Sequence, residues 1–493
     1  MGGNASANAI LTDNITVNEG VLDAVNKGQV SGSDFIEWTP VGLANNAYTG
    51  TFDGQGHTIS GLYFNHPDAS YVGLFGHIGA NGKISNVGVS DSYFQFRMKG
   101  GGGVCGKNDK DGVLQNCSNS STVIGKNQNS RTGGVCGDNS GTVRDCKNTG
   151  SVSGENFVGG VCGINPGTIK SCYNTGSVHG TDICVGGVCG NSFRVTDTNY
   201  CYYLSDTATR GIGNLMADEK DKAEKMSEEQ FASGEVAWLL NGKGSGEQVW
   251  GQQLGIDPSP VPGSDYKVIK AAQGDKDANG HYTYWATFSN LKNDVTLSVP
   301  SGRKLYVYNA TVSGGKLTLT QRNDNQVAKE EGVLLKTDVE YVNAKANKEN
   351  VLPKASSDLV ATQAETQIVT AETGYILYRL TYKNDTNKEG LGFYLGVDKA
   401  NNSYDGTRLK ATPGKAYLKV SENDAKAPSS EALTRSFVFG GGSETTGIEE
   451  ITIMGTDVQR HGTIEGIFDL QGRKIVNPTK GIYIKNNKKV IIK

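Results

Sequence analysis

The sequence predicts an all-β protein: an N-terminal right-handed parallel β-helix with a short helical cap, then an antiparallel β-sandwich and a small C-terminal β module. Three observations predict this order. A glycine-rich block recurs in the first part of the chain, a helix-start signal and a Pro-rich stretch follow it, and strands of period two fill most of the rest. The expected boundaries are 1–215 for the β-helix, 216–263 for the cap and linker, 264–440 for the sandwich and 441–493 for a linker and the last module.

The recurring block reads Gly-Gly-Val-Cys-Gly. Its four copies begin at Gly102, Gly133, Gly159 and Gly186, which are 31, 26 and 27 residues apart. A second block, which contains Cys-x-Asn-Thr-Gly-Ser-Val, follows the two middle copies. Two strand-length segments per period, with Gly or Asn at the corners, are typical of a coil that turns once per repeat and stacks on itself. The repeat therefore predicts a parallel β-helix.

An earlier copy of both blocks contains no cysteine and shows which kind of position the cysteines occupy. Phe75 stands in place of the first cysteine, and Val87 stands in place of the second. Eight of the nine cysteines are therefore expected in apolar, inward positions: Cys105, Cys136, Cys162 and Cys189 in the first block, and Cys117, Cys146, Cys172 and Cys201 in the second. Free thiols packed as small hydrophobic groups are favoured. The alternative is one disulfide per repeat, which export would permit.

Asparagines recur at two corners of the repeat. Because neighbouring rungs lie about 4.8 Å apart, equivalent residues of successive repeats stack as ladders. The first expected ladder contains Asn108, Asn139 and Asn165, and the second contains Asn119, Asn148 and Asn174. Their amides are expected to bond the rungs above and below, where backbone groups would otherwise lack partners.

The segment before the repeats carries a family resemblance. Residues 51–62 read Thr-Phe-Asp-Gly-Gln-Gly-His-Thr-Ile-Ser-Gly-Leu and lead into Gly-Leu-Phe-Gly and then into the Gly-Gly-Val-Cys-Gly copies. In order and spacing, residues 36–205 resemble the GLUG-motif proteins, which are surface proteins of anaerobic Gram-negative bacteria often labelled adhesin-like. The resemblance implies a β-helix and an extracellular or outer-membrane-surface location, and it implies no catalytic residues.

A second resemblance lies at the C-terminus. The segments 467–474, 481–484 and 489–493 contain, in order, an aspartate, Gly-Arg, Gly-Ile-Tyr and a closing basic strand. This order resembles the C-terminal sorting domain of proteins exported by type IX secretion. Short β modules also end proteins that are never processed, so the sequence leaves open whether this module is cleaved or anchors the protein.

The middle of the chain carries ordinary secondary-structure signals. Ser227-Glu-Glu-Gln is a capping box that predicts a helix over 227–241, which we expect to close the open end of the β-helix. The Pro-rich stretch 257–263 is interpreted as a stiff linker. Strands with one apolar and one polar face predict the sandwich. They are expected at 304–308, 316–320, 332–335, 375–378, 393–395 and 415–420.

Composition and spacing exclude several classes of protein. A net charge of −3 gives no electrostatic case for nucleic acid, and no apolar run is long enough to span a membrane. The first residues do not form an export signal, so we expect any such signal to lie outside this chain. Gly101-x-Gly103-x-x-Gly106 fits a dinucleotide fingerprint without the strand and helix that it needs. The run 275–280 begins like a calcium loop but lacks its glutamate, which favours a turn. We therefore expect neither a cofactor nor a metal.

Aromatic residues are the best binding candidates in the repeat region. They are Tyr93, Phe94 and Phe96, where later copies are polar, and Tyr202 and Tyr203 at the last rung. Stacked on a sugar ring, they could bind a glycan. The alternative is that they cover the ends of the coil or pack against the cap.

Catalysis is disfavoured because each variable ladder contains a single acid, with Asp138 and Asp145 in one repeat as the best pair. The first hypothesis is a non-enzymatic, adhesin-like protein that presents a rigid face to a host surface protein or glycan. The alternatives are a polysaccharide-active enzyme and a purely structural spacer. The oligomeric state is left open.

Overall fold

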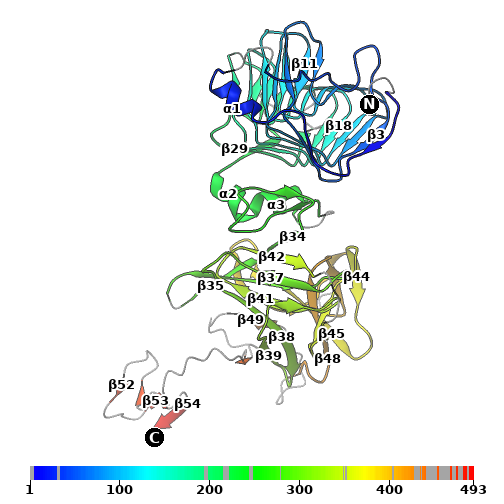
Figure 1. The fold of residues 1–493 in the computed structure, drawn as a ribbon. Coiled ribbons are helices and arrows are strands. Elements are labelled where there is room, and N and C mark those ends of the chain that lie inside the picture. Colours follow the sequence, from blue (N-terminus) through cyan, green and yellow to red (C-terminus); the bar gives the residue numbers. More distant parts are fainter. Residues whose placement is uncertain are drawn as a thin grey trace.

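The computed structural model describes residues 5–439, apart from 30–33, 182, 194–197, 215–220, 244–247, 278, 348, 350–351, 402–404, 427–433 and 435, and beyond 439 it describes only the backbone of five short strands. In Figure 1 a parallel β-solenoid lies at one end, two short helices follow, and antiparallel sheets come next. The predicted all-β class and the parallel β-helix are confirmed.

Five parallel sheets, A to E, form the solenoid, and each full repeat contributes one strand to every sheet in that order. Sheet A contains β6 (Tyr71–Val72), β11 (Gly100–Gly102), β16 (Arg131–Gly133), β21 (Val158–Gly159) and β26 (Val185–Gly186). Sheet B contains β7 (Phe75–Ile78), β12 (Cys105–Asn108), β17 (Cys136–Asn139), β22 (Cys162–Asn165), β27 (Cys189–Ser192) and β30 (Ile212–Asn214). Sheet C contains β1 (Ala9–Ile10), β3 (Thr51–Asp53), β8 (Lys83–Ser85), β13 (Val113–Gln115), β18 (Thr142–Arg144), β23 (Thr168–Lys170) and β28 (Thr198–Asn199).

The two remaining sheets complete each turn. Sheet D contains β2 (Ile15–Thr16), β4 (Thr58–Ser60), β9 (Gly88–Ser90), β14 (Ser118–Asn119), β19 (Lys147–Asn148), β24 (Tyr173–Asn174), β29 (Cys201–Leu204) and β31 (Ala223–Met226). Sheet E contains β5 (Tyr63–His66), β10 (Tyr93–Phe96), β15 (Thr122–Gly125), β20 (Val152–Gly154) and β25 (Val178–Gly180). The solenoid therefore extends to Met226, past the boundary expected at 215, because β31 still pairs in parallel with β29.

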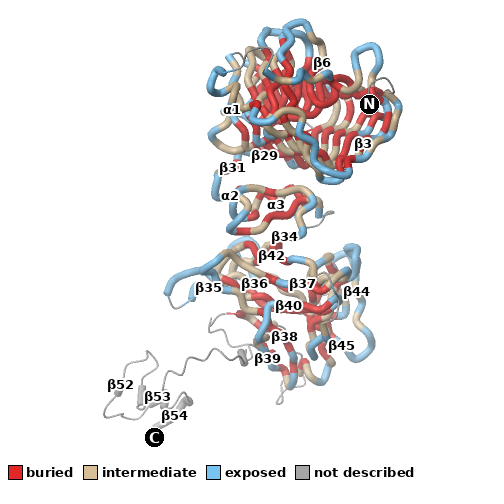
Figure 2. Tube along the Cα trace, viewed as in Figure 1, coloured by how far each residue is buried: buried red, intermediate tan, exposed pale blue. Residues whose placement is uncertain are grey.

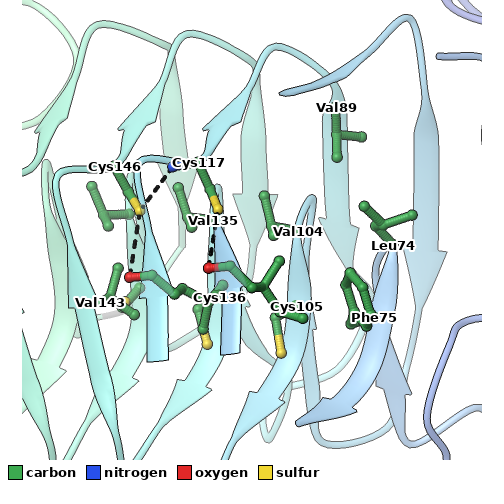
Figure 3. Packing of buried hydrophobic residues seen from close by; sticks show 14 of the residues in the cluster. Leu74, Phe75, Val89, Val104, Cys105, Cys117, Val135, Cys136, Val143 and Cys146 are labelled. Atoms are coloured by element: carbon green, nitrogen blue, oxygen red, sulfur yellow. Dashed lines mark hydrogen bonds between the residues drawn. The ribbon is translucent and has the colours of Figure 1, made fainter. Parts of the chain in front are cut away.

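Cysteine side chains fill two columns of the solenoid interior (Figure 3). In the sheet B column, Phe75 is followed by Cys105, Cys136, Cys162 and Cys189 in register. The second column contains Cys117, Cys146, Cys172 and Cys201, and all nine cysteines, including Cys184, are buried and outside any disulfide. The prediction of inward thiols is confirmed, and the structure contains no disulfide among them. Burial raises the pKa of thiols such as Cys162 and Cys172, which keeps them protonated at neutral pH.

Both predicted asparagine ladders are present. In the first, Nδ2 of Asn108 donates to Oδ1 of Asn139 at 2.8 Å, and Asn139 donates to Asn165 at 2.7 Å. In the second, Asn119 donates to Asn148 at 2.8 Å, and Asn148 donates to Asn174 at 2.7 Å. All six amides are buried. They tie each rung to the next at corners that water does not reach.

Glycines allow sheets A and B to lie against each other. A Cβ added at Gly163 of β22 would lie 2.6 Å from the backbone nitrogen of Thr132 in β16 and 2.7 Å from the carbonyl oxygen of Gly137. A Cβ added at Gly190 of β27 would likewise lie 2.7 Å from the backbone nitrogen of Val158 in β21. The last glycine of Gly-Gly-Val-Cys-Gly is therefore required because it faces backbone, where no side chain fits.

A helix that the sequence did not predict covers part of sheet E. This is α1 (Val21–Asn26), whose first backbone N–H groups, at Val21 and Leu22, donate to the carboxylate of Asp91, between β9 and β10. Val21 is buried against Tyr63 and Tyr93. The helix has only six residues, too few for a clear helical period in the sequence.

The cap contains two helices, α2 (Glu228–Ser233) and α3 (Glu235–Leu240), where one was predicted over 227–241. The capping box at Ser227 is present, but Gly234 adopts a φ of 94° and ends the first helix. The prediction that the cap closes the end of the coil is wrong. It packs on the outer face of sheet D, where Tyr173 and Tyr202 are buried together with Phe231.

The Pro-rich stretch is likewise not a free linker. The hydroxyl of Tyr173 donates to the carbonyl of Pro260 at 2.6 Å, and β33 (Val261–Pro262) pairs with β32 (Trp250–Gly251). On the other side of the cap, Asn343 bonds the backbone of Leu254 and of Gln252, at 2.8 and 2.7 Å. The cap therefore joins the solenoid to the antiparallel sheets, and Figure 1 shows it between them.

Antiparallel sheets follow the cap. Sheet F contains β34 (Tyr266–Lys270), β42 (Tyr341–Ala346), β37 (Val295–Ser298) and β40 (Gln326–Val327). Sheet G contains β35 (Ala272–Lys276), β36 (Tyr282–Phe288), β41 (Val333–Thr337), β38 (Leu305–Ser313), β39 (Lys316–Gln321) and β50 (Thr452–Met454). Sheet H contains β43 (Leu359–Ala361), β48 (Ala416–Ser421), β45 (Tyr375–Asn384), β46 (Glu389–Leu395) and β49 (Ser436–Val438). The pair β44 (Gln367–Thr370) with β47 (Arg408–Ala411) and a 3-10 turn, η2 (Lys399–Asn401), complete this region.

The predicted sandwich has three layers, because sheet G is covered on both faces. One hydrophobic core lies between sheets F and G, and a second lies between sheets G and H. Val333 and Leu335 of β41 face the first core, and Leu334 between them faces the second. A central strand of this kind has no polar face, so the two-faced pattern expected from the sequence holds only for the outer sheets. Figure 2 shows both buried layers.

The C-terminal module is described only as backbone. Its strands β51 (Ile467–Phe468), β52 (Lys474–Ile475), β53 (Gly481–Lys485) and β54 (Lys488–Ile492) form a four-stranded antiparallel sheet. The residues between β51 and β52, which carry the Gly-Arg of the resemblance, lie outside the described residues, as does the predicted joint that begins at Gly440.

The cysteine columns predict how the thiols react. We expect a chromogenic thiol reagent to modify almost none of the nine cysteines in the folded protein and all nine in denaturant without reductant. Fewer than nine thiols in denaturant would show disulfides. Cys146→Val should change stability by less than about 1.5 kcal/mol, because Val87 fills the equivalent position of the same column two rungs earlier. Cys146→Asp, which buries an unpaired acid, is the destabilising comparison.

The glycine contact predicts a large effect for a single added methyl. Gly163→Ala should lower the stability of the solenoid by about 3 kcal/mol, because the backbone on both sides cannot move away. Gly56→Ala is the matched control in the same coil, since Gly56 has a φ of +85° but no atom within 4 Å. It should cost only about 1 kcal/mol of backbone strain. Melting temperatures followed by circular dichroism decide between the two, and equal shifts would contradict the proposed contact.

Candidate functional site

The five aromatic residues predicted to bind a ligand are not available to one. Phe94, Phe96 and Tyr203 point into the solenoid core, and Tyr202 is covered by the cap. Tyr93 lies under α1, stacked on Tyr63 with ring centroids 6.0 Å apart. As glycan-stacking residues these predictions were wrong, and the alternative of packing against the cap describes Tyr202. The sequence could not show the cover, because α1 and the cap come from outside the repeats.

The two acids weighed for catalysis do not form a pair. Asp138 lies in sheet B and bonds the guanidinium of Arg131. Asp145 lies at the corner between sheets C and D and accepts from Arg144 at 3.0 Å. Each carboxylate thus has its own arginine, and the two belong to different sheets.

A surface pocket of about 560 Å³ lies beside the first rungs of the solenoid. Its walls come from residues 37–45 and from the end of β5 with the connection to β6. The aromatic side chains in the wall are Trp38, Phe64 and Tyr71, and the charged ones are Glu37, His66 and Asp68. Apolar and aromatic walls with a few polar groups, in a volume of about 300–1,000 Å³, are typical of sites for small ligands.

The repeat holds the wall segment in place. Glu37 pairs in parallel with Tyr63 of β5, and Val41 pairs with Phe75 of β7, so this segment continues sheets E and B by one incomplete rung. The backbone N–H of Trp38 donates to Tyr63 at 2.8 Å, and its ring Nε1 donates to the carbonyl of Gly73 at 3.1 Å. The indole is therefore fixed at both ends without a ligand.

A cluster of charged side chains lies next to the pocket. His77, Lys107 and Asp138 occupy adjacent positions on three strands of sheet B. Asp109 joins the first two, because its carboxylate lies 2.8 Å from Nε2 of His77 and 2.8 Å from Nζ of Lys107. Tyr71 connects this cluster to the pocket, with its ring centroid 5.4 Å from that of His77 and 5.6 Å from Nζ of Lys107.

The pairing explains the titration of these groups. Partial burial alone would raise the pKa of Asp109, but hydrogen bonds from Lys107 and His77 hold it below its ordinary value. Burial works against the charge of Lys107 as well, and Asp109 nevertheless raises its pKa. Both groups are therefore charged at neutral pH. The carboxylate of Asp109 therefore pairs with both Lys107 and His77, while Nδ1 of His77 is buried without a hydrogen-bond partner.

Asp145 is the carboxylate with the most perturbed environment. Burial, together with the neighbouring Cys146, raises the pKa of Asp145 to about 6. It occupies a corner where Asn86 and Asn116 precede it, and all three residues adopt a φ of 55°. Asn116 donates to Asn86 at 2.6 Å, while its own Oδ1 is buried without a partner next to the Asp145 corner. Asp145 is thus a break in a third amide ladder.

Sequence reasoning missed the pocket because its residues precede the regular repeats. The available signal was that residues 36–45 and 65–71 interrupt the glycine-rich pattern with aromatic and charged residues. The run 275–280 forms the expected turn, in which the carboxylate of Asp277 accepts from the backbone of Asn279 and His281. Within the described ranges, no three His, Cys, Asp or Glu side chains are grouped around a possible metal position.

Two known proteins share short segments with this chain. A 56-residue segment is 39% identical to a protein named as a Gly-rich membrane protein of Evansella cellulosilytica, and it covers 11% of this chain and 6% of that protein. A 99-residue segment is 36% identical to halomucin of Haloquadratum walsbyi, covering 19% of this chain and 1% of halomucin. No protein-family model and no solved structure matches the chain. The chain therefore spans only a small part of the length of either protein. In the part of the chain with described structure, no helix has the length and apolarity of a membrane span.

The interrupted ladder predicts that Asp145→Asn stabilises the protein. The amide can donate to Oδ1 of Asn116 and removes a carboxylate that burial disfavours. Because the folded pKa is raised above the unfolded one, the wild type loses stability as the pH rises from about 4 through 6. The variant should therefore gain about 1–2 kcal/mol at pH 7, after allowance for solvent screening, and much less at pH 4.

Asp53→Asn is the matched control, and its expected effect on stability at pH 7 is opposite to that of Asp145→Asn. A hydrogen bond from Asn86 lowers the pKa of Asp53, so this charge is favourable and its removal should destabilise the protein at pH 7. Melting temperatures of the three proteins between pH 4 and 7.5 provide the measurement. A variant at 145 that melts below the wild type at pH 7 would contradict the interrupted ladder.

Proposed function

We propose that this protein is a non-enzymatic, adhesin-like binding protein, secreted or attached to the surface of a bacterium, that presents its solenoid to a host surface protein or glycan. The solenoid fold, the two surface-class likenesses and the resemblance to GLUG-motif proteins support this proposal. Its C-terminal module would serve export, in line with the resemblance to a sorting domain.

One observation carries the proposal: a preformed polar and aromatic surface lies beside the first rungs of the solenoid. We call it the N-terminal patch, and it contains Glu37, Trp38, His66, Asp68, Tyr71, Lys99 and Lys107. Its first segment is held by the parallel pairing of Glu37 with Tyr63 and of Val41 with Phe75, over a buried apolar core. A partner that binds there has little to order in this protein, so most of the contact energy contributes to affinity.

The paired charges favour binding over catalysis. Glu37 bonds His66 at 2.8 Å, Asp109 bonds Lys107 and His77, and Asp138 bonds Arg131. A glycosidase needs two carboxyl groups facing one another across a substrate, one of which can hold a proton at working pH. Opposite charges side by side are instead typical of surfaces that recognise polar partners.

A second surface offers extended area. The outer side chains of sheet C are exposed or half-buried on strands such as β3, β13, β18 and β23, and they include Arg144 and Lys170. They form straight columns along the coil, because the strands are in register. A flat face of this kind suits contact with another large surface.

The purified protein on an array of glycans and matrix proteins tests the proposal. We expect binding to at least one of them, and weaker binding by a triple variant with alanine at Tyr71, Lys99 and Lys107. The control replaces Lys276 and Tyr282 by alanine, a similar lysine–tyrosine contact on the antiparallel sheets with Nζ 4.9 Å from the ring. Binding to nothing would favour a spacer, and cleavage of an arrayed glycan that is lost in Asp138→Asn would overturn the non-enzymatic proposal.

A further inference from the structure

The pocket of the N-terminal patch has the chemistry of a saccharide site. A sugar ring presents apolar C–H faces and a rim of hydroxyl groups, so its sites combine an aromatic wall with planar polar side chains. Trp38 and Tyr71 supply the aromatic surface, and Glu37 and Asp68 supply carboxylates that accept from hydroxyl groups. These residues lie in one pocket, although they come from two segments that neither repeat block contains.

We infer that this pocket binds a neutral saccharide, as one or two sugar rings of a host glycan, an inference that rests on the proposed binding function. The volume of about 560 Å³ is that of a small-ligand site. The indole of Trp38 is held at its backbone and at Nε1, so its position in the wall is fixed before the ligand arrives. Preorganisation of this kind lowers the cost of binding.

Charge selects a neutral ligand over an ionic one. The carboxylates of Glu37 and Asp68 line the pocket and would repel an anionic sugar. A cationic ligand would be repelled at Tyr71 by two lysine ammonium groups. Nζ of Lys99 lies 5.4 Å and Nζ of Lys107 lies 5.6 Å from the centre of the Tyr71 ring. The side chain of His66 bonds Glu37 at 2.8 Å and so holds that carboxylate in place.

Polar groups at the rim can address separate hydroxyls. Asp68 and Asn45 both line the pocket and are exposed, and Ser70 lies between Asp68 and Tyr71 in the chain. The exposed Leu43 adds apolar surface on the side formed by the first rung. The ligand would therefore contact both segments at once. Among the described residues, the open face of the solenoid offers no second segment for such a contact.

Intrinsic tryptophan fluorescence of the full chain tests the inference, because Trp38 is a wall residue, whereas Trp250 and Trp285 are buried elsewhere and Trp238 lies in helix α3 of the cap. The probes are the neutral disaccharides lactose, maltose and diacetylchitobiose, with glucuronate and choline as the anionic and cationic comparisons. We expect saturable quenching by at least one neutral probe and none by the ionic ones. Asp68→Ala and Tyr71→Ala should each raise its Kd about tenfold, which corresponds to about 1.4 kcal/mol.

Two controls keep the result interpretable. Tyr282→Ala removes a comparably exposed tyrosine outside the pocket and should bind as the wild type does. Asp68 is exposed on a connecting segment, so Asp68→Ala is expected to fold even if Tyr71→Ala does not, and melting temperatures verify this.

Each remaining outcome has one meaning. If the protein binds a glycan on the array but both variants retain full affinity, the pocket assignment is overturned and the proposed function stands. If it binds only a matrix protein, or an ionic probe more tightly than every neutral one, the neutral-saccharide inference is overturned alone. If it binds nothing on the array and none of the probes, the proposed function fails together with it.

Discussion

Stacking of equivalent residues at the spacing of neighbouring parallel strands is the constraint on which the rest of this structure depends. Once the strands are in register, each position of the repeat becomes a column, and every column must be a favourable contact of a residue with its own copy. Valine, phenylalanine and cysteine satisfy this by apolar packing in the interior. Asparagine satisfies it by donating to the next asparagine while its oxygen accepts from the one before.

The outer faces of the coil follow from the same constraint and are used in different ways. Sheet A lies on sheet B without side chains between them, because glycine columns face backbone there. Sheet D carries Tyr173 and Tyr202 outward only at its last rungs, and the cap packs on them. Helix α1 covers the tyrosines of sheet E. Sheet C and the pocket beside the first rungs stay accessible to solvent.

The charged cluster shows how a regular scaffold can hold an irregular surface. His77, Lys107 and Asp138 share one column, so neighbouring rungs bring a base, a cation and an acid side by side. Asp109 and Arg131 neutralise the charges that would otherwise repel or remain unpaired. Because Asp109 contacts both His77 and Lys107, one carboxylate fixes side chains from two neighbouring rungs.

The sequence by itself determined the solenoid, the inward cysteines and the two asparagine ladders, since each depends only on a repeat that can be compared with its own copies. The capping box at Ser227 and the strands beyond 304 were also predictable, because they depend on local patterns. Only the tertiary structure decided which elements cover which faces of the sheets. It buried Tyr93 under α1 and Tyr202 under the cap, divided the predicted helix at Gly234 and covered both faces of sheet G. It also brought Trp38 and Tyr71 into one pocket. These outcomes depend on contacts between segments far apart in the chain. A period or motif within one segment does not indicate which other segment it will contact.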